Sequence, residues 1–355
     1  MRRSILTALT LAMAFSSVRA QASPWTLPQG HAVLMGGLDF AVTSREFIDR
    51  GPERNFPLAG RYTGTSLRIG GRFGLTDRLE LEASLPFRFV AYTSDPIILV
   101  PRPAGVEDEL DYYQRNVVDF SRSGAGIGDL DLSGRYRWTT GRFALATEVR
   151  IKTPTGYRGP EGTFGTEPTT TEDFMAQAGD LVRPSNVRDD VTLGDGQMDV
   201  SASMLAGVAT SFGLFARGAA GYKLRLGGAG DQVIGDLRVG QAIGRRFLLY
   251  VSGTVAYSVQ RGRVVGISAS AVDPDLPATA YADNDNILLI ERRLEFDAVD
   301  VGAGFIWRMA DTVELNAGYQ RTVWGRFLAA SNVLAVSVAL RMDLTKDATD
   351  PNRTR

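Results

Sequence analysis

The chain has 355 residues, with 39 Lys and Arg against 40 Asp and Glu, and a formal net charge of −1. This balance argues against a nucleic-acid-binding protein, which carries a basic excess. Cysteine is absent and His31 is the single histidine, which excludes disulfides, thiolate metal sites and histidine clusters. Beyond the first twenty residues there is no run of about 18 apolar residues, so no helical membrane span is expected. No cofactor and no metal are expected either.

The first segment has the three parts of a secretory signal peptide. Arg2 and Arg3 give a positive start, and an apolar core follows over Ile5–Phe15. Small residues then offer a cleavage site, so residues 1–22 are predicted to be removed. The sequence thus predicts three parts: the signal peptide over 1–22, a barrel over 23–344 and a polar periplasmic tail over 345–355.

The mature chain alternates apolar and polar residues with the period of two that is typical of strands with one face of each kind. Several of the segments have 10 or more residues, against the span requirement of about 9–11. The predicted strands are His31–Thr43, Thr65–Phe73, Leu79–Tyr92, Ile127–Trp138, Arg142–Thr153, Gln197–Val208, Leu214–Leu226, Gln232–Ala242, Phe247–Gln260, Arg293–Arg308, Val313–Thr322 and Asn332–Asp343.

The connections between these segments alternate in length. Short turns such as Gly74–Arg78 and Thr139–Gly141 alternate with long segments such as Ser44–Gly64, Thr93–Ser123 and Thr155–Gly196. This alternation is typical of outer-membrane barrels, which have short periplasmic turns and long extracellular loops. The expected fold is therefore all-β: a transmembrane antiparallel up-and-down β-barrel of about 12 strands, within a range of about 10–14. A soluble β-sandwich would have strands of about 5–6 residues and less unequal loops.

The two faces of the strands differ in chemistry. Aromatic residues lie near both ends of the apolar face, as in the girdles of membrane barrels. They are Phe73, Trp138, Phe143, Phe247 and Trp307 near the proposed periplasmic ends, and Phe89, Tyr222, Tyr257 and Tyr319 near the proposed outer ends. The other face is charged and is predicted to line the lumen, with an excess of basic residues that predicts a mild anion preference if the channel is open. The candidate lumen-lining residues are Arg68, Arg72, Glu80, Glu82, Arg88, Asp129, Asp131, Arg135, Arg137, Glu148, Arg150, Lys152, Arg217, Lys223, Arg225, Asp236, Arg238, Asp300, Glu314 and Arg341.

Several stretches have the look of a known family: Arg72–Phe87, Gly126–Arg137, Glu148–Gly156, Gly194–Val200 and Gly218–Tyr222. They resemble the outer-membrane β-barrel family of the MetA pathway of phenol degradation, a putative transporter family. The resemblance runs from about Gly36 to Leu344 and rests on turn-and-strand signatures. It implies an outer-membrane pore or transporter for aromatic or other poorly soluble small molecules. One departure is the polar tail Thr345–Arg355, because many outer-membrane barrels end on an aromatic residue.

Few residue groups suggest covalent chemistry. His31 sits at the entry to the first strand, which leaves no histidine base for an embedded lipase. Glu80 and Glu82 are favoured as lumen charges paired with arginines over an acid–base pair. The glycines of 124–128 precede a strand, whereas a phosphate-binding loop opens a helix. Asp283–Asn286 lacks the glycine and spacing of a calcium loop.

The segment Thr155–Gly196 is the best candidate for a constriction. It carries apolar residues that need a packing partner, with Phe164, Phe174 and Met175 as the candidate residues. They either fold into the barrel mouth or cap the extracellular rim, and the sequence leaves both open.

These features predict passive passage of small molecules through a charge-lined lumen, filtered by the loops Thr93–Ser123 and Thr155–Gly196, without enzyme activity. The expected partners are outer-membrane lipid and lipopolysaccharide, the barrel assembly machinery and a small-molecule solute. One alternative is a structural or adhesive barrel with a plugged lumen, because 12 strands fall between the filled barrels of about 8 and the open ones of about 16–18. The other is an outer-membrane lipid hydrolase.

Overall fold

The computed structural model describes residues 23–98, 110–111, 117–139, 141–181, 191–281 and 286–345. The predicted signal peptide, most of the predicted tail and most of the Asp283–Asn286 motif lie outside these ranges. No helix among the described residues is long and apolar enough to cross a membrane.

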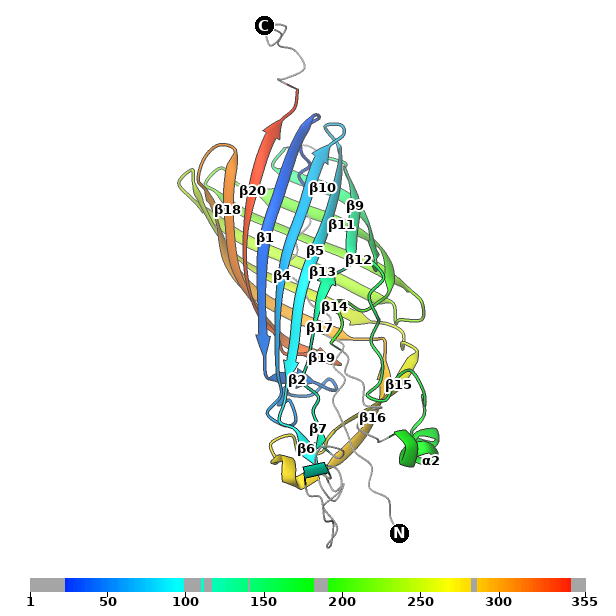
Figure 1. The fold of residues 1–355 in the computed structure, drawn as a ribbon. Coiled ribbons are helices and arrows are strands. Elements are labelled where there is room, and N and C mark those ends of the chain that lie inside the picture. The colour runs from blue at the N-terminus through cyan, green and yellow to red at the C-terminus, as the bar shows by residue number, and fades with distance from the viewer. Residues whose placement is uncertain are drawn as a thin grey trace, which may run out of the picture.

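The chain forms one closed antiparallel barrel (Figure 1). The sheet has 13 strands, but β8 and β9 follow each other along the chain and both pair with β5, so the wall has twelve positions. Closure is complete because β1 pairs with β20 on one side and with β4 on the other. Closure pairs the strand edges, as lipid requires of a spanning sheet. The wall strands are β1 (His31–Thr43), β4 (Arg61–Gly74), β5 (Leu79–Thr93), β8 (Arg122–Ile127), β9 (Leu130–Arg137), β10 (Phe143–Thr153), β11 (Met198–Ala209), β12 (Leu214–Leu226), β13 (Gln232–Ile243), β14 (Phe247–Ser258), β17 (Asp297–Arg308), β18 (Val313–Arg326) and β20 (Asn332–Asp343).

The predicted barrel of about twelve strands, with short turns at one end, is confirmed. The short-turn end, where β1 begins and β20 ends, is taken as periplasmic. The smaller elements gather at the opposite end (Figure 1). They are β2 (Arg45–Phe47), β3 (Arg54–Asn55), β6 (Ile97–Ile98), β7 (Val117–Val118), α2 (Thr171–Leu181), β15 (Val264–Ala271), a 3₁₀ helix (Ala278–Tyr281), β16 (Ile287–Arg293) and β19 (Leu328–Ala329).

Two predicted strands differ from the structure. The strand expected from Arg293 begins instead at Asp297, because Arg293 ends β16, which pairs with β15 in a separate hairpin. The pairing of β17 with β18 shifts register between Val299 and Asp300, as a β-bulge does. The strand expected from Ile127 is broken after Ile127, where the Gly128 amide bonds to the Pro86 carbonyl. Pro86 has no amide hydrogen, so the wall is irregular at this point.

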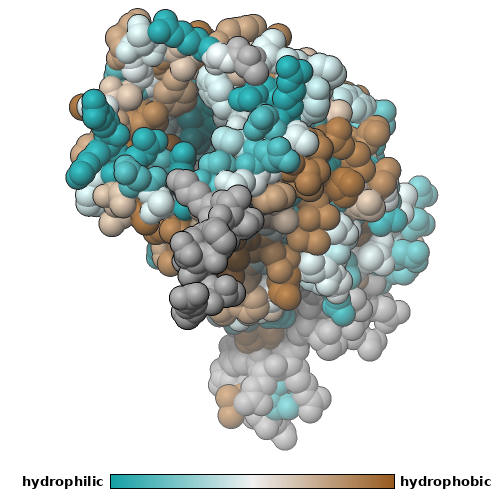
Figure 2. Space-filling model, turned by 90° about the horizontal axis from the view of Figure 1, so that it is seen from above, coloured by the Kyte–Doolittle hydropathy of each residue, from teal (hydrophilic) through white to brown (hydrophobic). Residues whose placement is uncertain are grey.

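The outer wall is apolar. Large aliphatic side chains such as Ile69 and Leu237 lie exposed on the outward face, as do eight of the nine aromatic residues predicted for the two girdles. The ninth, Trp307, is half-buried and stacks on Phe247 with ring centroids 5.8 Å apart. Figure 2 looks at the end that carries the C-terminus: hydrophilic side chains gather around a hollow, and hydrophobic side chains cover the wall beside it. Such an apolar surface would be unfavourable in water and matches the hydrocarbon core of a bilayer. The exposed girdle residues are Phe73, Phe89, Trp138, Phe143, Tyr222, Phe247, Tyr257 and Tyr319.

Candidate functional site: a charged lumen

The barrel wall surrounds a lumen that contains a cavity of about 470 Å³. Six arginines and four carboxylates line it together with small and apolar residues. The volume is that of a small-molecule site. The charged lining residues are Arg68, Arg72, Arg150, Arg217, Arg238, Arg341, Asp39, Glu82, Asp131 and Glu314.

Arg135 is the centre of a buried charge network inside the wall. Its guanidinium lies 2.7 Å from Glu80, 2.6 Å from Glu148 and 3.5 Å from Glu82, and its side chain is 2% exposed. Arg150 also bonds Glu148, at 3.0 Å. We call Arg135, Glu80, Glu82, Glu148 and Arg150 the inner charge network. The strand pairing explains it, because β9 lies between β5 and β10 and presents Arg135 directly opposite Glu80 and Glu148.

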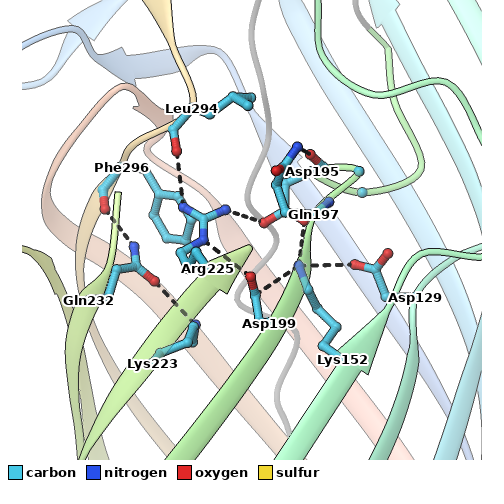
Figure 3. A network of polar contacts seen from close by, with 12 residues as sticks. Asp129, Lys152, Asp195, Gln197, Asp199, Lys223, Arg225, Gln232, Leu294 and Phe296 are labelled. Carbon is cyan, nitrogen blue, oxygen red and sulfur yellow. Dashed lines mark hydrogen bonds and ion pairs between the residues drawn. The ribbon is translucent and has the colours of Figure 1, made fainter. Parts of the chain in front are cut away.

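A second network lies in the outer part of the lumen, on the β9–β12 side (Figure 3). Lys152 contacts three carboxylates, those of Asp129, Asp195 and Asp199. Arg225 lies 2.5 Å from Asp195 and 3.4 Å from Asp199. We call these five residues the outer charge network. Asp195 belongs to the β10–β11 loop, so the network fastens this loop to the barrel wall.

The electrostatics of Asp195 fit this fastening role. Burial alone would raise the pKa of its carboxyl, but Lys152 and Arg225 outweigh burial and hold the pKa below its usual range. Asp195 therefore stays ionised at neutral pH. The same loop is held a second time, because the Arg88 guanidinium donates a hydrogen bond of 2.7 Å to the Leu193 carbonyl.

An apolar outer cap covers the extracellular end. Phe164 and Phe174 are buried in it, with ring centroids 5.1 Å apart, whereas Met175 is exposed. Of the two placements that the sequence left open for the Phe164 and Phe174 side chains, the structure has them packed in the cap at the rim. The outer cap consists of the buried residues Phe56, Leu58, Tyr62, Val90, Tyr92, Ile97, Val118, Phe120, Phe164, Phe174, Ile267, Ala271, Tyr281 and Ala329.

The segment Ser23–Pro28 lies across the periplasmic end. It lines the lumen cavity, and the Leu27 amide donates a hydrogen bond of 2.7 Å to Glu80. Near β11 a Cβ on Gly207 would come within 2.6 Å of the Pro24 side chain and 2.7 Å of Trp25, so the segment rests on the inner wall. The segment thus forms part of the periplasmic side of the cavity, whose other lining residues come from the barrel wall.

The other predicted lumen residues are placed as follows. Arg68 pairs with Asp39 at 2.9 Å, and Asp300 accepts hydrogen bonds from Thr254 and Thr322. Arg137 bonds the Asp77 carbonyl near the periplasmic rim, where Arg341 and Arg308 both pair with Glu314. Lys223 bonds Gln232, and Asp131 and Asp236 each have one buried oxygen without a hydrogen-bond partner.

The remaining motifs form no reactive arrangement. His31 contacts the Gln29 carbonyl and lies 3.9 Å from Asp343, and neither group is a serine hydroxyl. Glu80 and Glu82 both face Arg135, and Gly124–Gly128 lies in β8 and the break after it. Among the described residues, no group of three or more Asp, Glu or His is placed to hold a metal ion.

Sequence reasoning missed several functional neighbours. Asp39 and Asp199 share the inward face of their strands with predicted lumen residues, so strand parity could have found them. Asp195 and Tyr157 lie in a loop, where no periodic pattern indicates that they meet Lys152 and Asp129. The placement of Trp25 in the lumen has no signal in its local sequence.

Glu46 on β2 is buried in the outer cap region at 2% exposed and pairs with Arg54 at 3.1 Å. Burial raises its pKa to about 7 despite the nearby Arg54 and Arg292. The pKa of Glu46 in the folded protein therefore lies above its ordinary value of 4.5. Its contribution to the stability of the folded state is fully present below pH 4.5 and is lost as the pH rises through about 7. We therefore expect the β2–β3–β19 sheet to be more stable at pH 5 than at pH 8.

Hydrogen exchange of the β2 and β19 amides, corrected for intrinsic rates, measures this pH dependence. The Glu46→Gln variant should flatten it, because the variant has no titrating group at this position. Equal protection of the wild-type protein at both pH values would contradict the prediction.

With the geometry described, the fold can be compared with those of known proteins. No protein-family profile and no curated protein matches this sequence. The COG4313 outer membrane channel from Pseudomonas putida F1 is similar in structure, with a TM-score of 0.54 and 12% identity over 89% of this chain and 97% of that chain. The chain therefore has the fold of an outer-membrane β-barrel.

Two further solved structures are less similar. A TodX mutant described as a monoaromatic hydrocarbon channel has a TM-score of 0.43 and 12% identity, over 96% of this chain and 97% of that chain. The KdgM porin has a TM-score of 0.40 and 4% identity, over 86% of this chain and 98% of that chain.

Proposed function

We propose that this chain is a passive channel of the outer membrane for small molecules, with amphipathic or hydrophobic compounds, aromatic ones included, as its cargo. The observation that carries the proposal is the lumen cavity, which combines charged and apolar lining within a membrane-spanning wall. A filled structural barrel would leave no space of about 470 Å³ between its walls. The channel and hydrocarbon-channel names of the similar structures agree with this proposal.

The resemblance to the MetA-pathway family supports aromatic or other poorly soluble small molecules as the cargo. As partners we propose outer-membrane lipid and lipopolysaccharide around the apolar wall, and the barrel assembly machinery for insertion. The lumen-lining arginines, including those of the cavity, would set the field that a solute meets. The fastened loop and the Ser23–Pro28 segment would act as the filters at the two ends.

Single-channel conductance of the refolded chain that starts at Ser23 tests this function. We expect small, steady openings in a planar bilayer that aromatic acids or neutral phenols block, because solute and ions share one narrow path. Under a salt gradient, the sign of the reversal potential should indicate a mild preference for anions, because the cavity lining has six arginines and four carboxylates. Silent bilayers from verifiably folded, heat-modifiable protein would contradict the proposal and favour a plugged structural barrel.

A further inference from the structure

The lumen cavity has two chemically different sides. Small and apolar residues of β20 and β1, among them Ala335, Ala339, Val33 and Met35, face the space, although Asp39 and Arg341 on the same two strands line it as well. Seven of the ten charged lining residues come from the side formed by β4, β5, β9, β10, β12 and β13. A molecule that fills the cavity would therefore contact apolar groups on one side and charges on the other.

Most of the cavity arginines have carboxylate partners in the wall. Arg68 pairs with Asp39 at 2.9 Å, Arg150 with Glu148 at 3.0 Å and Arg341 with Glu314 at 3.0 Å. Arg72 lies 3.6 Å from Glu80, a carboxylate shared with Arg135. These pairs neutralise much of the charge of the lining.

Arg238 differs from the other cavity arginines. It makes no ion pair with any carboxylate of the described residues, and the residue is only 8% exposed. Its Nε, like those of Arg72 and Arg217, is buried without a hydrogen-bond partner. Its guanidinium instead lies over the Tyr250 ring, 3.9 Å from the centroid. Arg217 stands directly opposite on β12. The nearest acidic neighbour on the same strand face, Asp236, has an oxygen without a hydrogen-bond partner.

This arrangement is unfavourable unless an anion completes it. Two like charges at opposed positions of neighbouring strands repel each other, and the buried Nε of Arg238 makes no hydrogen bond, so an anion in the cavity would relieve both. The Tyr250 ring fixes the guanidinium by a cation–π contact and leaves its N–H edge for a ligand. That edge matches the two oxygens of a carboxylate.

We propose that Arg238, held by Tyr250 and assisted by Arg217, is the binding subsite for the carboxylate of an amphipathic organic acid in the lumen. The apolar body of the acid would lie along the β20–β1 side of the cavity. The inference rests on the proposed channel function and names its substrate class: small carboxylic acids with an aromatic or aliphatic body. The alcohol that corresponds to such an acid lacks the carboxylate that the two arginines would bind.

Equilibrium binding to the folded, detergent-solubilised protein tests the subsite, with phenylacetate and its alcohol, 2-phenylethanol, as the probes. We expect phenylacetate to bind more tightly than the alcohol, and Arg238→Gln to weaken phenylacetate by about tenfold or more with little change for the alcohol. Arg238→Lys should restore binding only in part, because an ammonium lacks the bidentate edge.

Arg308→Gln is the matched control, since Arg308 also pairs with Glu314 but does not line the cavity. Its phenylacetate affinity should stay within about twofold of wild type. Equal losses in both variants would overturn the localised subsite in favour of a diffuse positive field. Equal affinity of the wild-type protein for phenylacetate and the alcohol would overturn it as well.

Conductance and solute flux separate this inference from the channel function. A protein that passes neutral solutes but shows no preference for the acid keeps the channel and overturns the subsite. A folded protein that binds phenylacetate through Arg238 but passes nothing keeps the subsite and overturns the channel.

Discussion

Replacing Arg135 by methionine should destabilise the barrel by about 3–5 kcal/mol, the cost of removing one partner from a buried charge network. The Arg135 guanidinium is within 4.0 Å of three carboxylates, those of Glu80, Glu82 and Glu148, and is 2% exposed. Methionine has a similar length but no charge, so Glu80 loses its closest cation and Glu148 keeps only Arg150. Urea unfolding in lipid vesicles, followed by tryptophan fluorescence, measures the loss in the free energy of unfolding.

Arg137→Met is the matched control for this experiment. Arg137 lies on the same strand and face, two residues further on, but bonds only the Asp77 carbonyl among the described residues. We expect its cost to be about 1 kcal/mol or less. Adding Glu80→Gln and Glu148→Gln to the Arg135 variant should recover part of the stability, because the excess negative charge is removed. A loss for Arg135→Met no larger than for Arg137→Met would show that the inner charge network does not stabilise the barrel.

The sequence predicted the barrel wall well because each strand has one face in lipid and the other in the lumen. That contrast gives an alternation that can be read directly, as in Leu130–Arg137, where Arg135 and Arg137 fall on the inward face. Register follows from the same alternation, since a slip by one residue would place these charges in lipid. The strand count, the order and the alternation of turn lengths could therefore be predicted.

The ends of the barrel could not be predicted in this way. The composition of the β15–β16 hairpin is like that of the wall strands, and the alternation therefore predicts a wall strand from Arg293 onward. In the structure Arg293 ends β16, which pairs with β15 outside the barrel wall. Phe164 and Phe174 share the outer cap with residues from four other loops and from the ends of β4 and β5, and such contacts between distant segments follow no local period. The same holds for Asp195, whose partners Lys152 and Arg225 lie on different strands.

The segments at the two ends of the lumen differ in how firmly they are held in place. The extracellular end has an apolar cap and a loop held by the outer charge network, so opening it would expose buried apolar area and break several ion pairs. The periplasmic end is crossed by Ser23–Pro28, a short segment outside any strand that is held by side-chain and backbone hydrogen bonds to Gly141, Asp77 and Glu80. The periplasmic closure should therefore be the easier one to remove.

Deleting Ser23–Leu27 should raise the single-channel conductance severalfold, because this segment forms the floor of the lumen cavity. The barrel itself should remain folded, since the deletion stops short of β1 and removes no strand pairing. Conductance in planar bilayers measures the change, and heat modifiability on a gel verifies the fold. An unchanged conductance would mean that the ion path does not pass the segment, and the periplasmic filter would have to lie elsewhere.

A reversible version of this experiment fixes the segment in place. The chain has no cysteine, so the pair Pro24→Cys and Gly207→Cys is unique, and the close approach of these two positions suits a disulfide. The oxidised variant should keep the low conductance under all conditions that open the wild-type protein, and reduction should return it to wild-type behaviour. If the disulfide forms and the conductance of the oxidised variant still rises under the conditions that raise the wild-type conductance, the segment is not the barrier to ions. The narrowest point must then be at the loop that Arg88 and the outer charge network hold against the wall.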